Sequence, residues 1–462
     1  MEAVDSVAAR PTPIRRARAV LFFAFAFAVM ADPVSSVAYA IEAALRALGG
    51  HLSLLLPAMG LVIGLIALVT LNYWHLVRAF PEGGGSPEAA GRAFGQQWTF
   101  LPIGALVVDF ALTIAISVAA AGSALVALAP TLASARIPID LAMVAAVAGL
   151  TWFGHGGRLI FAAMTTLFIL ASVPVLAIGW ISPADAHGSA PITGSASPAL
   201  VAVILAFPVA MALATGTEAP ATSIAQLGQL DNRGRRRFGR GTLALTIVIV
   251  GGLTMGLTAL AVHLHVGIPG HDETQIAEIA RAATGGGGLF GFFQVTSGLL
   301  LLAAAASSFQ AGPGLLKALA RVGPRGEEGL LPRRLGRTNQ HHTPVAAVGL
   351  YAVISAVIIL VASGREQELV LVYAVAVFVS FLAGLLAMAR FSHRRGARLL
   401  TVTNLIGAAG VTFTLLVNLE RGYPLLALGG TVLIAAVLYW RWVRAGRPRG
   451  IDAIEREAEA ED

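Results

Sequence analysis

The sequence predicts an all-α integral membrane protein, and three observations support that fold class. Hydrophobic residues make up 56% of the 462-residue chain. Charged residues make up only 12%, about half the fraction found in soluble domains. Apolar runs of roughly 20 residues, long enough to cross a bilayer, recur from end to end. This composition favours one helical membrane domain over several soluble ones.

The apolar runs predict twelve transmembrane helices between residues 18 and 442. Residues 1–17 would form a short cytoplasmic N-terminal segment, and residues 443–462 a short cytoplasmic tail. The expected spans are 18–46, 52–79, 99–129, 138–155, 159–182, 198–228, 242–266, 287–311, 343–363, 367–390, 399–419 and 422–442.

The basic residues predict the orientation of these spans. Only five of the 32 Lys and Arg residues fall on the predicted outer side: Arg46, Arg136, Arg281, Arg365 and Arg421. This bias follows the positive-inside rule, so both termini are expected in the cytoplasm of a multi-pass cell-membrane protein. The net charge of +7 therefore indicates orientation and does not point to nucleic acid. The chain has no cysteine, which excludes a disulfide framework and a thiolate metal site.

Two spans are interrupted by polar residues. The first contains "ADPVSS", in which Asp32 precedes Pro33, and the sixth contains "ALATGTEAPATS", in which Gly216 and Pro220 flank Glu218. A proline removes a backbone donor, and unpaired backbone groups at membrane depth are tolerated only where they line a cavity or bind an ion.

The two interruptions stand five spans apart, which indicates an internal repeat. Two inverted repeats of five helices, each with one discontinuous helix at the midplane, give this spacing. We therefore expect a LeuT-type 5+5 fold with discontinuous helices 1 and 6. The repeats would cover about 18–182 and 198–390, with extra helices over 399–442.

The third span carries a polar stripe. Asp109, Thr113 and Ser117 follow one another at intervals of four and share one helix face. Hydroxyls in membrane helices often bond their own backbone, so a structural role is an equal alternative for Thr113 and Ser117. An intramembrane carboxylate costs roughly 2.5 kcal/mol or more and is functional by default. Asp32, Asp109 and Glu218 are therefore the main candidate site residues.

Tyr39 lies seven residues after Asp32, about two helical turns further along the same side of the first span. It is either a pathway residue or part of an interfacial aromatic belt. Asp32 itself has a structural alternative, because it could cap the half-helix that begins at Pro33.

Several segments resemble the amino acid–polyamine–organocation superfamily, and more narrowly the KimA-type potassium–proton symporters and their permease relatives. These segments are "DPVSSVAYAIEAAL", "AFPEGGGS", "VVDFALTIAISVAAAG", "TGTEA", "EEGLLPRRL" and "VYAVAVFVSF". The resemblance extends over residues 18–442 and implies a secondary active transporter. By resemblance, a cation site would use Tyr39, Asp109, Thr113, Ser117 and Thr215, and proton coupling would use Asp32 and Glu218. Such symporters usually carry a long cytoplasmic region that binds a cyclic dinucleotide, and residues 443–462 are too short for one.

The chemistry of the first interruption separates two substrates. Amino acid carriers of this fold hold the substrate carboxylate with free N–H groups of a Gly-rich break. Here Pro33 has no N–H, and Asp32 would repel a carboxylate. Potassium prefers several neutral oxygens with little charge. The sequence therefore favours proton-coupled uptake of a small cation, potassium above others. The alternative is a proton- or sodium-coupled amino acid or amine permease.

Other classes of protein fit less well. A channel needs a continuous pore, a sensor normally carries an output domain, and no catalytic constellation indicates an enzyme. The expected partners are the cation or amino acid substrate, the coupling proton and membrane lipid, without a cofactor or nucleic acid, and the chain is compatible with a homodimer.

Overall fold

The structure is a computed structural model that describes residues 13–153, 158–185, 198–270, 273–320, 329–421 and 425–447. The ends of the two predicted cytoplasmic segments, residues 1–12 and 448–462, lie outside this part of the chain. Every regular element in the described residues is helical, as the composition predicts.

The helices follow one another with short connections. Their bounds are α1 (Pro13–Val29), α2 (Ala31–Ser35), α3 (Val37–Ala47), α4 (Leu52–Ala79), α5 (Gly85–Phe94), η1 (Gln96–Thr99), α6 (Phe100–Leu128), η2 (Pro130–Ala135), α7 (Arg136–Thr151), α8 (Arg158–Ile181), α9 (Ala199–Ala210), η3 (Met211–Ala214), α10 (Ala219–Ser223), η4 (Ile224–Gln226), α11 (Asn232–His263), α12 (Gln275–Thr284), α13 (Gly288–Ala320), α14 (Arg333–Gly336), α15 (Val345–Val361), α16 (Glu366–Arg394), α17 (Arg398–Glu420) and α18 (Leu425–Arg444).

Ten helical segments within the described residues are long and apolar enough to cross a membrane. Two shorter apolar helices, over 18–29 and 345–361, accompany them. The chain is therefore a multi-pass membrane protein, and the count of twelve spans stays a prediction. Two boundaries differ clearly from expectation, because α11 already begins at Asn232 and α13 continues to Ala320 as a single helix that contains Pro313.

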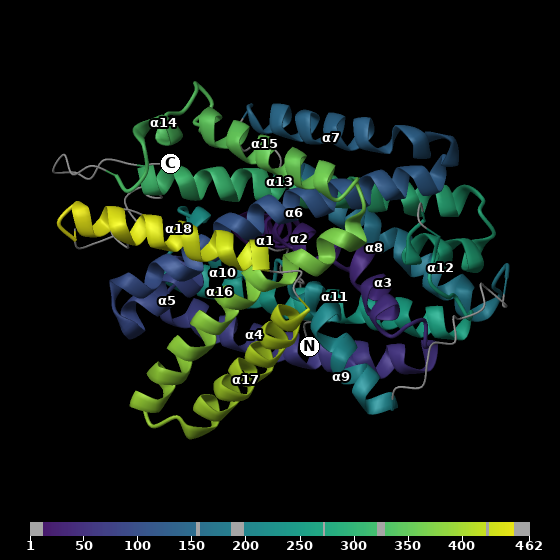
Figure 1. Cartoon of the computed structure of the whole chain (residues 1–462), viewed down its shortest axis with the longest axis horizontal. Helices are drawn as coiled ribbons and strands as arrows, with labels where there is room; N and C mark the ends of the chain where they lie inside the picture. The colour runs from purple at the N-terminus through teal and green to yellow at the C-terminus, as the bar shows by residue number, and fades with distance from the viewer. Residues whose placement is uncertain are drawn as a thin grey trace, which may run out of the picture.

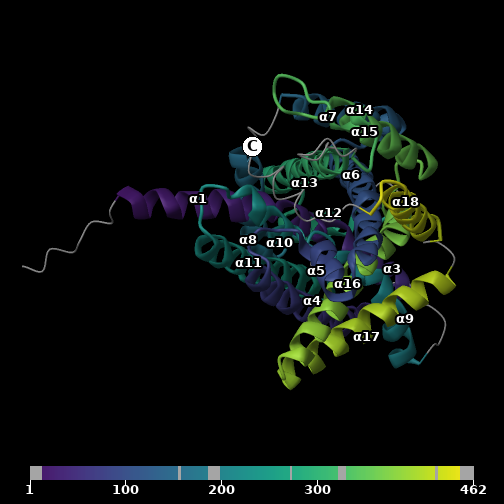
Figure 2. The ribbon, with the colours of Figure 1, turned by 90° about the vertical axis from the view of Figure 1, so that its left-hand side faces the viewer.

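The bundle is arranged around α6 and α13, which run side by side through its interior (Figure 1). Helices α7 and α15 lie together along one edge, and α16 crosses the bundle so that its later part pairs with α17 at the opposite edge. Figure 2, a view turned by 90°, shows the beginning of α1 extending out of the bundle. This arrangement leaves α2 in the interior, where it contacts α13 and where all five of its residues are buried.

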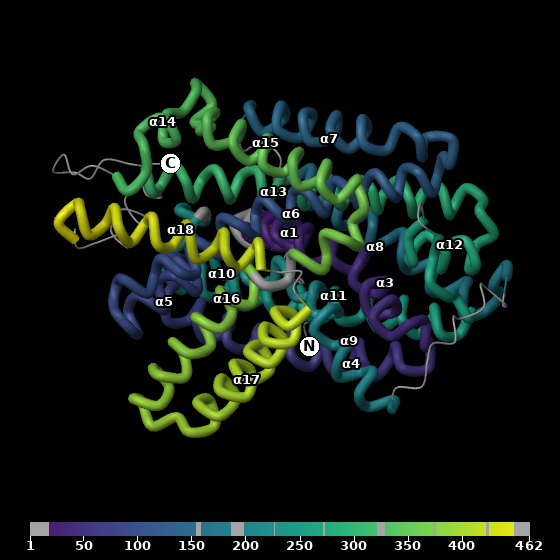
Figure 3. Tube along the Cα trace, in the orientation of Figure 1, coloured from purple at the N-terminus to yellow at the C-terminus, as the bar shows by residue number. Residues whose placement is uncertain are grey.

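Both interruptions predicted from the sequence are present, but they differ in depth. The first span continues from α1 through α2 to α3, and the linking residues Met30 and Ser36 keep right-handed helical angles. The sixth span unwinds completely, because Thr215 is extended and Gly216 has φ +75°. In Figure 3 the chain of α1 enters the centre of the bundle, and α3 and α9, which contact each other, lie together away from it.

Candidate functional site

The two interrupted spans touch at Asp32. A Cβ atom at Gly216 would lie 2.7 Å from Asp32 Cγ and 2.7 Å from the backbone nitrogen of Pro33. Only glycine fits here, for two reasons. A side chain would clash with Asp32 and Pro33, and the positive φ of Gly216 would strain any other residue. Nearby, the Ser36 hydroxyl donates a hydrogen bond to the Leu213 carbonyl oxygen at 3.0 Å. The sixth span thus packs its unwound turn directly on the predicted site residue of the first.

Tyr39 faces the same junction. Its hydroxyl lies 3.4 Å from the Thr215 hydroxyl, and its side chain is 1% exposed. Asp32 and Asp109 both lie within electrostatic reach of this phenol. Tyr39, Thr215, Asp32 and Asp109, which come from three spans, therefore lie near one another in the buried interior. Because its side chain is buried there, Tyr39 does not belong to an interfacial aromatic belt.

The predicted stripe on the third span is confirmed as one face of α6. Asp109, Thr113 and Ser117 are all buried. No residue in the described part of the chain forms a hydrogen bond with the Ser117 hydroxyl oxygen. The same holds for one carboxyl oxygen of Asp32, Oδ1. Buried polar atoms are normally paired, so these oxygens are available to a ligand.

Glu218 sits in a different environment from Asp32. Its Oε2 atom accepts hydrogen bonds from the hydroxyls of Tyr73 at 2.9 Å and Ser380 at 2.8 Å. The Tyr73 hydroxyl also lies 2.9 Å from the Ser86 hydroxyl of α5. The remaining oxygen, Oε1, has no hydrogen-bond partner among the described side chains and backbone. Glu218 therefore joins the sixth-span break to α4, α16 and α5.

Sequence reasoning missed Tyr73, Ser86 and Ser380 as partners of the site. It also missed Tyr351 of α15, which lies within electrostatic reach of Asp109 and donates to the Val107 carbonyl oxygen at 3.3 Å. Each is a polar side chain in an apolar helix or in the "FPEGGGS" segment. That polarity was the one sign in the sequence that these residues could belong to the site. Which helix it faces depends on packing, so the sequence could not assign its partner.

The structure contradicts the capping role that was the structural alternative for Asp32. The helix begins at Ala31 and its N-cap is Met30, so Asp32 lies inside α2 and does not cap a helix that begins at Pro33. The Thr215 hydroxyl, by contrast, does donate to its own backbone, at the Ala212 carbonyl oxygen 2.9 Å away. The Thr215 hydroxyl still faces the junction, because the Tyr39 hydroxyl lies 3.4 Å from the same oxygen.

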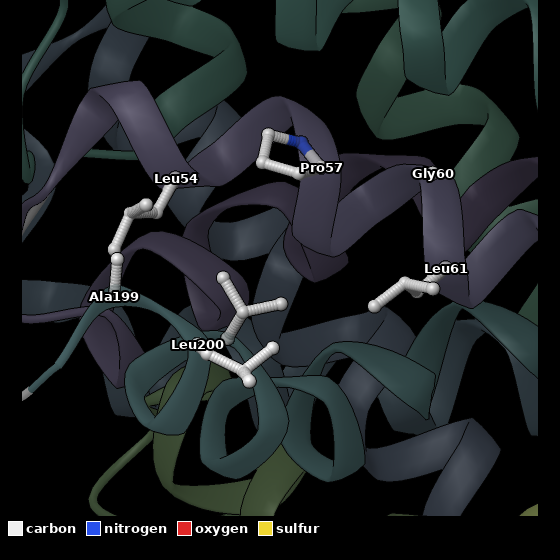
Figure 4. Close-up of a pocket in the computed structure, with 7 residues that line it drawn as sticks. Leu54, Pro57, Gly60, Leu61, Ala199 and Leu200 are labelled. Atoms are coloured by element: carbon white, nitrogen blue, oxygen red, sulfur yellow. The ribbon is translucent and has the colours of Figure 1, made fainter.

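An apolar pocket lies elsewhere, between α4 and α9 (Figure 4). Its lining consists of Leu54, Pro57, Gly60, Leu61, Ala199, Leu200 and Val203. None of the predicted site residues reaches it, and its apolar walls offer nothing to a cation.

Comparisons with known proteins identify the family of this chain. The family described as amino acid permease matches residues 21–449. The potassium transporter KimA of Bacillus subtilis strain 168 is 29% identical over 370 residues, which cover 76% of this chain. The chain spans only 58% of that relative's length.

Solved structures share the fold at low identity. Two crystal structures of mutants of the Eremococcus coleocola manganese transporter give TM-scores of 0.53 and 0.52, both at 15% identity. Each match covers 95% of this chain and 97% of the other. The solved structures show the fold that this chain shares, and the family match shows that the chain belongs to the amino acid permease family.

Proposed function

We propose that the protein is a proton-coupled symporter that takes up a small cation, potassium above others. The observation that carries this proposal is the contact between Tyr39 and Thr215, which joins the two interrupted spans at a buried place beside Asp32 and Asp109. Hydroxyl oxygens and limited negative charge are the ligands that suit potassium. The relationship to a potassium transporter supports the same substrate.

The proposed cation site consists of oxygen atoms from three spans. Tyr39 and Thr215 supply hydroxyls at the junction, and Asp109 supplies the nearest carboxylate on α6. Thr113 and Ser117 continue the oxygen track one and two turns further along the same face. The buried Ser117 oxygen, which accepts no hydrogen bond from the described residues, would gain a partner when a cation binds.

The proposed proton sites are Asp32 and Glu218. Each keeps one buried oxygen without a hydrogen-bond partner in the described structure, and each lies within electrostatic reach of the other. Two neighbouring buried carboxyls disfavour a doubly charged state, because like charges repel strongly at low dielectric. A bound proton and a bound cation each relieve that repulsion. The binding of one therefore changes the affinity of the site for the other.

Alternating access would follow from the proposed LeuT-type arrangement of two inverted repeats. In that arrangement twelve helices cross the cell membrane, and both chain ends lie in the cytoplasm. A tag at the C-terminus should therefore be inaccessible to reagents added outside intact cells. Labelling of that tag from outside would contradict the topology.

Uptake into proteoliposomes tests the substrate and the coupling. We expect rubidium, a potassium analogue, to accumulate when the outside is acidic, and a panel of labelled amino acids not to. Asp109→Asn should abolish most rubidium binding while the protein still folds, and Thr113→Val should weaken it less. Glu368→Gln is the matched control, because Glu368 is 53% exposed and lies outside the site.

The alternative function is an amino acid or amine permease, which the family description favours. The same assay separates the two, because amino acid uptake without rubidium uptake would overturn the potassium proposal. Accumulation driven by a sodium gradient and not by a pH gradient would replace the proton with sodium as the coupling ion.

A further inference from the structure

A second buried polar cluster lies at the end of the bundle that the basic-residue pattern assigns to the outside. We call Ser123, Arg136, Asp140 and Glu366 the outer cluster. Arg136 Nη2 lies 2.6 Å from Glu366 Oε2 and also donates to the Ser123 hydroxyl. The Ser123 hydroxyl donates to the same Glu366 oxygen at 2.7 Å. This ion pair is 7% and 6% exposed and ties α6, α7 and α16 together.

Asp140 lies one helical turn after Arg136 and is fully buried. Its carboxyl group sits between two glycines. A Cβ atom at Gly122 would overlap Asp140 Oδ1, and a Cβ atom at Gly364 would lie 2.8 Å from Asp140 Oδ2. The carboxyl group fits this place only because both neighbours lack side chains.

Neither carboxyl oxygen of Asp140 accepts a hydrogen bond from the residues that the structure describes. A buried carboxylate without donors is strongly disfavoured, whereas the neutral acid is tolerated. Of the charged groups within electrostatic reach, Arg136 attracts a charged Asp140 and Glu366 repels it. Arg136 is already paired with Glu366, and Glu42, which lies within electrostatic reach of Glu366, is paired with Arg46 at 2.8 Å. The region therefore has one carboxyl group more than it has cations.

We propose that Asp140 is a second proton-binding site, separate from Asp32 and Glu218, and that its proton keeps Arg136 bound to Glu366. When the acid gives its proton to water on the predicted outer side, it becomes a carboxylate four residues from Arg136 on the same helix face. It then competes with Glu366 for the guanidinium, and the link between α7 and α16 weakens. Acidic conditions outside therefore favour a closed outer end, and alkaline conditions favour separation of the two helices.

The absence of cysteine makes a distance measurement straightforward. Ser134 of η2 and Glu368 of α16 are exposed, and Ser134→Cys with Glu368→Cys places one spin label beside each helix. In lipid bilayers we expect a short distance at acidic pH and a growing longer population at alkaline pH. One released proton changes the ratio of the two populations by at most about tenfold per pH unit.

Further substitutions in the Ser134→Cys, Glu368→Cys protein test whether Asp140 is the proton-binding group. Asp140→Asn should keep the short distance at every pH, and Glu366→Gln should lose it at every pH. Asp140→Ser, which is smaller and also neutral, serves if the asparagine variant does not fold. Glu278→Gln removes another acid of the predicted outer side and should titrate like the parent protein.

Two outcomes would overturn the proposal. One is a pH response that persists unchanged in Asp140→Asn and Asp140→Ser. The other is a response to potassium or sodium concentration at fixed pH with none to pH, which would make the ligand a metal cation. The readout does not depend on transport, so it stays informative if the proposed potassium function fails. Asp32→Asn and Glu218→Gln should leave the distance change in place.

Discussion

The two interrupted spans stand five predicted spans apart in the sequence, and each accommodates its break and its carboxyl group in a different way. At the first, Asp32 interrupts a helix that barely unwinds, and its Oδ1 atom has no hydrogen-bond partner in the described residues. At the second, the chain unwinds at Gly216, and Glu218 is held by the hydroxyls of Tyr73 and Ser380. One carboxyl group thus has an oxygen open to the junction, and the other is anchored directly to two neighbouring helices, α4 and α16.

This difference suggests that the two acids have different functions. A carboxyl group without donors exchanges partners easily, so Asp32 is suited to respond to a cation at the junction. An anchored carboxyl group transmits its state to the groups that hold it. Through Tyr73 and Ser86, Glu218 is connected to α5 on the predicted inner side.

The largest effect is expected from Gly216→Ala. The new methyl group would clash with Asp32 and with the backbone of Pro33, and the positive φ adds strain of about 1–3 kcal/mol. We expect uptake to be lost and the unfolding temperature in detergent to fall. Gly252→Ala is the control, because a Cβ atom at Gly252 meets nothing within 4 Å. Normal uptake by Gly216→Ala would show that the contact between the two breaks is dispensable.

Removing the charge of each acid should reduce pH-driven uptake by about tenfold or more, because neither variant can bind and release a proton. Asp32→Asn should keep measurable rubidium binding, and so should Glu218→Gln. The measurements are uptake with a pH gradient and rubidium-dependent thermal stabilisation. Full retention of uptake in Asp32→Asn would remove this residue from the coupling step.

Removal of one hydroxyl that donates a hydrogen bond to Glu218 should have an intermediate effect on uptake, and this effect should be specific to Glu218. Tyr73→Phe removes one of its two donors, and an acceptor left less satisfied in a buried site costs about 1–3 kcal/mol. We expect a shifted pH profile of uptake with little change in rubidium affinity. Ser380→Ala should act in the same direction. Ser355→Ala is a matched control, because its hydroxyl donates to the Ala111 carbonyl oxygen away from Glu218.

The smallest effect is expected from Tyr39→Phe, which deletes one neutral oxygen at the junction and leaves every acid in place. Rubidium affinity should fall several-fold, by about 1 kcal/mol, and the pH profile should keep its shape. The affinity can be read from the rubidium concentration at half-maximal uptake. A changed pH profile with unchanged affinity would instead place Tyr39 on the proton route.

Much of the fold could be predicted from the sequence, and so could the polar residues that meet where the two interrupted spans touch. Helical spans follow from apolar length, and the interruptions follow from Asp32, Pro33 and the "TGTEAP" segment, because polar groups at membrane depth are costly and stand out. The common face of Asp109, Thr113 and Ser117 follows from spacing alone. The partners of Glu218 do not, since Tyr73 and Ser380 reach it from helices far apart in the chain.

The sequence by itself determined that this is a multi-pass helical protein with acids and helix breaks at membrane depth, because hydropathy and proline act locally. Only the tertiary structure decided that Tyr39 meets Thr215, that the sixth span unwinds more than the first, and that Asp140 lies beside an ion pair. These facts depend on how helices rotate and approach one another. Packing of small residues such as Gly122 and Gly216 sets that approach, and no local pattern encodes which side chains will face each other.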